Sequence, residues 1–231
     1  MEYLKLDEDA QRERSFIRQV YLWMALALLT TAAVAFSISV SPSLMEALFS
    51  NRSSFFVLAI AEVLIVAYLS GRIHKMTSQT ALLVFAVYSI LNGITFSWIF
   101  LAYSLGSIAS VFLTTAGTFG VMCVYGYVTK KDLSSIGNLC FMALIGLIIA
   151  SIVNIFIVND AFSMIISVIG VIIFVALTAY DMQKIKRMAI SLNHSIDEDF
   201  TSKVSILGAL TLYLDFINLF LYLLRLFGKK R

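Results

Sequence analysis

Two aspartates in strongly hydrophobic surroundings are the residues whose types and positions suggest chemistry. Asp215 lies near the middle of the apolar segment 204–224, and Asp181 directly follows the apolar segment 161–180. An ionised carboxylate deep in a membrane helix is costly, so Asp215 should face a protein interior or a water-filled cavity. If the two carboxyl groups meet, they cannot both ionise cheaply and would share one proton, which makes them a plausible pH-operated gate. Once that proton leaves, their oxygens suit Ca²⁺.

Other polar residues are candidates for an ion pathway. Thr211 lies four residues before Asp215 and Asn218 three residues after it, which places all three on one helix face. Glu62 lies near the middle of an earlier apolar segment. These oxygens are few for a cation that prefers roughly six to eight ligands. The sequence therefore predicts weak, transient Ca²⁺ binding at the two aspartates and not tight storage.

Each of these residues also has a structural interpretation. Asp181 would then be a solvated carboxylate at the membrane surface that pairs with Lys184 or Lys186. Asp215 would form a hydrogen bond to another helix, and Arg72 would be a positively charged anchor at the end of its helix. The residues alone leave both interpretations open.

The elements that carry these residues are predicted membrane helices. With 60% hydrophobic and 13% charged residues and a mean hydropathy of +0.92, the chain cannot be an ordinary soluble domain. Long uncharged runs and a single proline favour helices over a membrane β-barrel. We predict an all-α polytopic membrane protein with seven transmembrane helices. The predicted spans are 20–40, 54–71, 80–103, 109–128, 137–158, 161–180 and 204–224.

Charge separates the chain into a leader, a membrane domain and a tail. A charged leader (1–19) and a basic tail (225–231) flank a single transmembrane domain (20–224). Lys and Arg alternate between the short connections, which predicts a cytoplasmic amino terminus, and their positions exclude a nucleic-acid patch. The short connections favour a bacterial inner membrane. The segment 204–224 either crosses fully, which places the tail outside, or re-enters; its length favours full crossing.

The sequence gives little support for an enzyme, and no cofactor is implied. His74 and His194 lie in predicted connections without a nucleophile motif near them. An intramembrane aspartyl protease would also use two helix-borne aspartates, but Asp215 lacks the preceding glycine of that class.

Two short segments carry a resemblance. AYDMQ at 179–183 and LYLDFINLF at 212–220 resemble signature segments of the Bax inhibitor-1 (TMBIM) family, and the layout of spans and the length agree along nearly the whole chain. The resemblance implies a bundle whose last helix is central and surrounded by two three-helix layers. It also implies a pH-sensitive calcium leak in which Asp181 pairs with Asp215, Arg72 acts as a latch, and Glu62 is a further acidic position.

Three functional hypotheses follow. The first is the pH-gated Ca²⁺ leak. The second is a regulatory protein that binds a membrane protease or another membrane complex through the leader, as the resemblance to some bacterial proteins suggests. The third is proton-coupled transport of a small solute, which the acidic pair fits equally well. In each case the bilayer and protons are partners, and only the first requires Ca²⁺.

Overall fold

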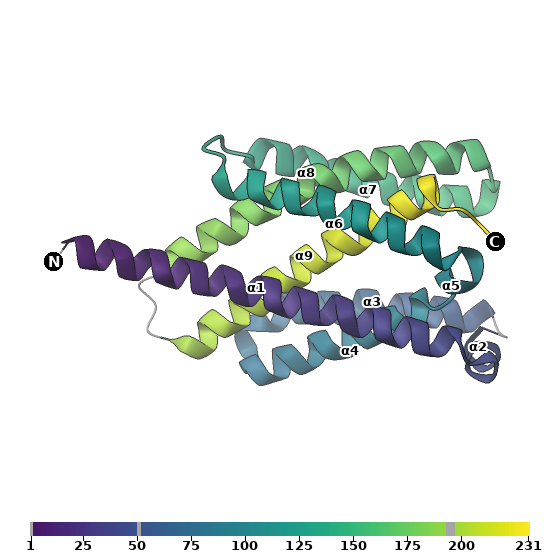
Figure 1. The fold of residues 1–231 in the computed structure, drawn as a ribbon, viewed down its shortest axis with the longest axis horizontal. Coiled ribbons are helices and arrows are strands. Elements are labelled where there is room, and N and C mark those ends of the chain that lie inside the picture. Colours follow the sequence, from purple (N-terminus) through teal and green to yellow (C-terminus); the bar gives the residue numbers. More distant parts are fainter. Residues whose placement is uncertain (1, 50–51, 193–196) are drawn as a thin grey trace. The chain divides into compact units, whose positions relative to one another are not determined.

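The protein is helical throughout nearly all of the part that the computed structural model describes, which comprises residues 2–49, 52–192 and 197–231. No strand occurs within these ranges (Figure 1). The helices are α1 (Glu2–Ser39), α2 (Pro42–Phe49), α3 (Arg52–Arg72), the 3-10 turn η1 (Ile73–Lys75), α4 (Ser78–Phe96), α5 (Ile99–Ala102), α6 (Leu105–Val128), α7 (Ser134–Ile157), α8 (Asp160–Leu192) and α9 (Glu198–Phe227).

Within the described ranges, seven helical segments are long and apolar enough to cross a membrane, which confirms the predicted architecture. The most apolar window of α9 is 72% buried, whereas the corresponding windows of the other six segments are 11% to 44% buried. Such burial is what a central last helix requires. α9 is also unbroken over 30 residues. At roughly 1.5 Å per residue it spans about 45 Å, against a hydrocarbon core of about 30 Å, and this favours full crossing over re-entry.

The chain forms two compact units, each considered by itself. Unit 1 comprises Met1–Ala102, Met188–Tyr213 and Arg231, and unit 2 comprises Tyr103–Arg187 and Leu214–Lys230. Unit 1 contains α1, α3 and α4 with the first part of α9, and unit 2 contains α6, α7 and most of α8 with the rest of α9. Each unit thus has three long helices besides its part of α9, in agreement with the two three-helix groups that the resemblance implies.

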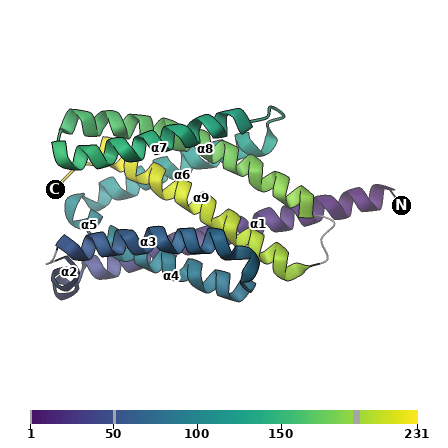
Figure 2. The same cartoon turned by 180° about the vertical axis from the view of Figure 1, so that it is seen from behind.

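In unit 1, α1 packs closely on α4, and α3 lies beside α4 (Figure 2). A Cβ atom on Gly93 would lie 2.7 Å from the Cβ atom of Val34, so only glycine permits this approach. Thr31 donates a hydrogen bond to the Ser89 carbonyl oxygen at 2.9 Å and is also bonded to the hydroxyl group of Tyr213 at 2.8 Å. Tyr213 is fully buried, and it joins α9 to the α1–α4 contact.

In unit 2, aromatic side chains join α9 to α6 and α8. The Phe216 ring meets Phe112 and Phe119 of α6 edge to face, with centroids 5.3 and 5.4 Å apart. Farther along α9, Tyr222 stacks on Phe174 of α8 at 5.9 Å. Contacts of this kind add to the large apolar area that aromatic rings bury, so they fix this part of α9 in its unit.

The amino-terminal helices differ from the predicted spans. α1 is continuous from Glu2, so the charged leader and the first span form one helix. The leader residues Glu, Gln, Arg and Leu are good helix formers, and a change of polarity marks a membrane boundary but not a helix end. The predicted loop 41–53 contains α2, which starts at Pro42, a residue suited to the first helical position. The loop assignment was therefore wrong for 42–49, and residues 50–51 lie outside the described part.

Other helices also begin or end at residues that differ from the predicted spans. α8 continues past the predicted end of its span at Tyr180 as far as Leu192. Between the predicted spans 80–103 and 109–128, the chain is non-helical at Tyr103 and Ser104, between α5 and α6. A further interruption, which the predicted spans lack, separates the end of α4 at Phe96 from the start of α5 at Ile99. α9 likewise begins at Glu198, before the predicted span 204–224, and residues 193–196 lie outside the described part.

Candidate functional site: a buried aspartate pair

Asp215 lies on α9 within unit 2 and is almost completely buried. Asp215 is 4% exposed, and its neighbours in the sequence, Tyr213 and Phe216, are buried as well. Among the described residues, its Oδ2 atom has no hydrogen-bond partner. A polar atom in this state is unfavourable for folding, because it has lost the hydrogen bonds of water without full replacement. Such an atom is therefore a candidate functional group.

The partner of Asp215 is Asp181 on α8, in the same unit. The carboxyl groups of the two residues lie within hydrogen-bonding reach of each other, and Asp181 is itself only 9% exposed. An ionised carboxylate can only accept, so a hydrogen bond between two carboxyl groups requires a proton on one of them. Lys184, one turn along α8, is the nearby cation whose charge acts on Asp181. We call Asp181 and Asp215 the aspartate pair.

The length of α8 explains how the pair can form. If Asp181 stood at the membrane surface, it would be about eleven residues, or roughly 16 Å, from the level of Asp215 on α9. Because α8 remains helical through Asp181 to Leu192, Asp181 is an interior residue of a long helix and not a terminal one. The stretch after Asp181 contains neither glycine nor proline, which favours continued helix.

Glycines bring the neighbouring helices close to α8 beside Asp181. A Cβ atom on Gly126 of α6 would overlap the carbonyl oxygen of Ala179, and one on Gly137 of α7 would lie 2.6 Å from the Tyr180 ring. Both contacts fall within two residues of Asp181. The position of this turn of α8 is thus set by backbone packing on two sides.

The other predicted pathway residues of α9 make local hydrogen bonds. Thr211 donates to the Leu207 carbonyl oxygen at 3.0 Å, and Asn218 donates to the Leu214 carbonyl oxygen at 2.8 Å. Both are half-buried. Their side-chain donors are therefore used within their own helix, which leaves their oxygen atoms as the groups available to a cation.

Glu62 and Arg72 belong to unit 1. Glu62 Oε1 accepts a hydrogen bond from Thr95 of α4 at 2.5 Å, and this contact joins α3 to α4. Arg72 ends α3 with an exposed side chain, and within the described part of the chain it forms no ion pair. The structure does not bring Arg72 and the aspartate pair together within one unit.

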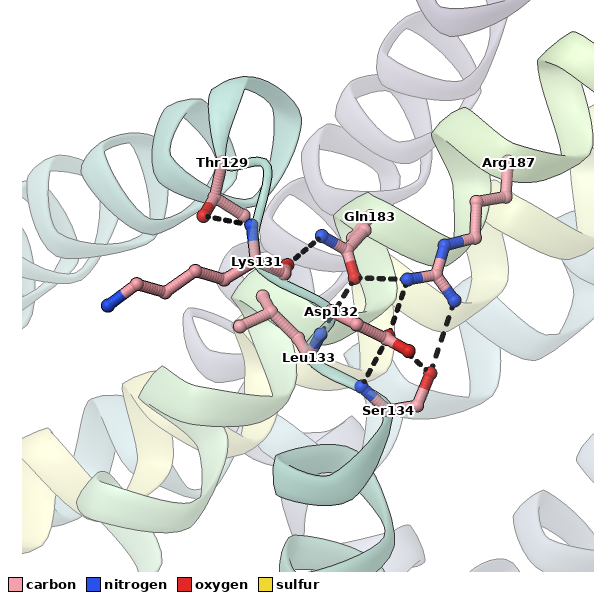
Figure 3. Close-up of polar contacts among 7 residues, drawn as sticks. All are labelled: Thr129, Lys131, Asp132, Leu133, Ser134, Gln183 and Arg187. Atoms are coloured by element: carbon pink, nitrogen blue, oxygen red, sulfur yellow. Dashed lines mark hydrogen bonds and ion pairs between the residues drawn. The ribbon is translucent and has the colours of Figure 1, made fainter.

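Sequence reasoning missed a group of polar residues next to the pair. The side chains of Gln183 and Arg187 on α8 bind the connection between α6 and α7 (Figure 3). We call this group the Gln183 cluster; its members are Lys131, Asp132, Leu133, Ser134, Gln183 and Arg187. The one available signal was Asp132, an acidic residue in an otherwise basic connection, but its partner lies 55 positions away.

Nothing in the described part of the chain resembles a resident metal centre, since no three His, Cys, Asp or Glu side chains gather there. The aspartate pair is the one place in unit 2 where two buried carboxyl groups meet. What it can do chemically is hold a proton, and offer oxygen ligands when that proton leaves.

A sequence profile described as "Inhibitor of apoptosis-promoting Bax1" matches residues 13–231. The chain belongs to the Bax inhibitor-1 family. The chain is 50% identical to the inner membrane protein YbhL of Escherichia coli K12 over 94% of its length and 93% of that protein. It is 42% identical to an uncharacterised protein of Borreliella burgdorferi over 95% of its length and 94% of that protein.

Membership of the Bax inhibitor-1 family agrees with the seven membrane-crossing segments. A membrane protein of Streptococcus pyogenes is also similar, at 40% identity over 81% of this chain and 80% of the relative. These relatives and the apolar helices establish a multi-pass membrane protein of a bacterial type.

Proposed function

We propose that this protein is a pH-sensitive calcium leak channel gated by Asp181 and Asp215. The observation that carries the proposal is the direct contact between two buried carboxyl groups, one of which has an unpartnered buried oxygen. The resemblance to the Bax inhibitor-1 family points to the same residues. The function requires no catalytic step and no bound cofactor.

The proton on the aspartate pair is what keeps the gate closed. Two ionised carboxylates about 4 Å apart repel each other by about 4 kcal/mol at an effective dielectric constant of about 20. The shared proton replaces this repulsion with a hydrogen bond between α8 and α9. When the pH rises and the proton leaves, repulsion favours separation of the two carboxylates, so the flux increases with pH.

The freed carboxylates then act as transient ligands for Ca²⁺. Calcium accepts loose geometry and needs roughly six to eight oxygens, of which the pair supplies at most four. The oxygens of Asn218 and of water would complete the shell. A site with so few protein oxygen ligands binds Ca²⁺ weakly, and weak binding permits the ion to leave again.

The positive-inside rule favours a cytoplasmic amino terminus, since Lys and Arg gather at the end of α3, directly after α6 and in the last part of α8. On this topology the Gln183 cluster is cytoplasmic. The latch role that the resemblance gives to Arg72, and the pathway roles of Glu62, Thr211 and Asn218, stay predictions.

The proposal is tested by Ca²⁺ entry into dye-loaded proteoliposomes from about pH 5 to pH 8, a window in which a coupled carboxyl pair can titrate. Asp215→Asn should flatten the pH dependence, because an amide cannot ionise. Asp160→Asn is the matched control: it makes the same chemical change at the exposed start of α8 and should behave as wild type. A protein without Ca²⁺ flux that instead moves protons with a solute would support the transporter hypothesis.

A second candidate function is partner binding through the leader. Arg12, Arg14 and Arg18 of the leader are exposed basic side chains and are part of a continuous helix. An exposed charged helix is a suitable surface for another membrane complex, and a membrane protease is the partner that the family resemblance suggests. Deletion of residues 2–14 should abolish partner capture under this hypothesis and leave Ca²⁺ flux unchanged under the first.

A further inference from the structure

The amide of Gln183 binds the backbone of the α6–α7 connection at two points. Its Oε1 atom accepts a hydrogen bond from the Leu133 backbone N–H at 3.0 Å, and its Nε2 atom donates to the Lys131 carbonyl oxygen at 2.8 Å (Figure 3). Gln183 is 7% exposed and Leu133 is 3% exposed. The first bond therefore satisfies a buried backbone N–H, and the second reaches the carbonyl group of an exposed residue of the same connection.

Arg187 joins the same connection from the next turn of α8. Its Nη2 atom donates to Gln183 Oε1 at 2.7 Å and to Asp132 Oδ1 at 2.6 Å, and its Nη1 atom donates to Ser134 Oγ at 3.1 Å. Ser134 also donates from its backbone N–H and its hydroxyl group to Asp132 Oδ1, at 3.0 and 2.7 Å. The guanidinium group thus supports the Gln183 amide and the start of α7 together (Figure 3).

A third contact fastens α8 to the end of α6. Lys186 Nζ donates to the Tyr127 carbonyl oxygen at 2.8 Å and lies 4.5 Å from the centre of the Tyr127 ring. Together with the Gln183 cluster, this contact holds three consecutive parts of the chain, the end of α6, the connection and the start of α7, against one stretch of α8.

We propose that Gln183 is a positioning residue for the aspartate pair, and that the Gln183 cluster sets how firmly α8 is held in the position where Asp181 contacts Asp215. Two residues along a helix are about 200° apart, so Asp181 and Gln183 point to opposite sides of α8. Asp181 meets α9, and Gln183 meets the α6–α7 connection. The predicted effect on flux rests on the proposed function: in the proposed leak channel, the Gln183 cluster sets the pH at which flux begins.

The mechanism follows from the direction of the forces. When the pair loses its proton, repulsion from Asp215 drives this turn of α8 away from α9. A firmly held α8 keeps the two carboxyl groups together, and the proton then stays until a higher pH. A loosened connection lets the groups separate more easily, so the proton leaves at a lower pH. A side chain that served only folding would change stability without moving this midpoint.

Asp132, the acidic member of the Gln183 cluster, does not titrate in the working range. The hydrogen bond from Arg187, and then those from Ser134, hold the pKa of Asp132 well below its usual range. The Asp132 carboxylate therefore stays ionised above about pH 4. The charged groups acting on Asp181 are Lys184 on its own helix and Asp215 on α9, so a shifted midpoint in a cluster variant reports on the position of α8.

The test measures protonation of the pair and Ca²⁺ flux in the same preparations. The infrared carboxylic acid band, assigned by its loss in Asp215→Asn, is titrated in nanodiscs for wild type, Gln183→Met, Arg187→Gln and Arg187→Lys. Gln183→Met keeps the length of the side chain but loses both backbone bonds. Lys130→Gln is the control, because it removes one positive charge from an exposed residue of the same connection.

We expect both midpoints, infrared and flux, to move to lower pH by about one unit in Gln183→Met and by less in Arg187→Gln. Arg187→Lys should recover part of the shift, and Lys130→Gln should match wild type. Unchanged midpoints with a lower melting temperature would overturn the inference. If Gln183→Met does not fold, the midpoints of Arg187→Gln provide the test instead. A wild type without Ca²⁺ flux whose infrared midpoint still moves in the cluster variants would refute the leak and leave the positioning role standing.

Discussion

Gly126 of α6 lies directly against the backbone of Ala179 in α8, at a distance that excludes a Cβ atom. Ala179 is two residues before Asp181. Gly126→Ala should therefore push this turn of α8 outward, lower the melting temperature and weaken the aspartate contact. Gly120→Ala on the same helix is the control, because nothing lies within 4 Å of a Cβ there. Alanine is favoured over glycine in a helix by about 1 kcal/mol, so Gly120→Ala should be neutral or stabilising. Equal effects in both variants, measured by thermal unfolding in detergent, would contradict the close contact.

Val158 ends α7 in the left-handed region, with φ of 50°. This conformation is costly for a β-branched residue, by about 1 to 2 kcal/mol, and glycine adopts it freely. Val158→Gly should raise the free energy of unfolding by about 1 kcal/mol. Ile155→Gly makes a similar change inside the helix at another exposed position and should lower stability by about the same amount. A loss of stability in both variants would show that the φ of Val158 carries no strain.

Thr31 and Tyr213 form the polar centre of unit 1. Tyr213→Phe removes one hydroxyl group and should cost about 1 kcal/mol. Thr31→Val should cost more, because it leaves both the Tyr213 hydroxyl group and the Ser89 carbonyl oxygen without this partner. The double variant should be less unstable than the sum of the two single changes. Thr30→Val, which alters a hydroxyl group bonded only to its own helix at Leu26, is the control and should have little effect.

The Asp132–Arg187 ion pair should make a pH-dependent contribution to stability. Because Arg187 lowers the pKa of Asp132, this contribution is complete above the ordinary aspartate value of about 4 and is lost as the pH falls through the lower folded value. Asp132→Asn should thus lower the melting temperature at neutral pH, and the difference from wild type should shrink in acid. Asp160→Asn should show no such convergence. A difference that grew as the pH fell would contradict the assigned sign.

The architecture could be predicted from the sequence, because each membrane span is a long apolar run that can be recognised from its own residues. The predicted span 109–128 located α6, and the carboxylate within 204–224 identified Asp215. The ends of the helices were harder to predict. A change in polarity marks the membrane surface, but α1 and α8 continue as helices beyond it.

Side-chain partners far apart in the chain could not be read from periodicity. The spacing of Thr211 and Asn218 predicts an ion pathway on one face of the helix, yet both donors bind carbonyl oxygens one turn back in α9. Gln183 stood within a segment that the family resemblance singled out, but its partners at 131 and 133 are set by tertiary packing. No spacing rule connects residues that lie some 50 positions apart.

The central claim is that Asp181 and Asp215 act as one unit that titrates and gates. The most direct measurement is the pH profile of Ca²⁺ entry into proteoliposomes for wild type, Asp181→Asn, Asp215→Asn and the double variant. Wild-type flux should rise with pH, and all three variants should give the same flat profile, because either substitution already removes the shared proton. A single variant that keeps the wild-type profile, or single effects that add in the double variant, would contradict the account.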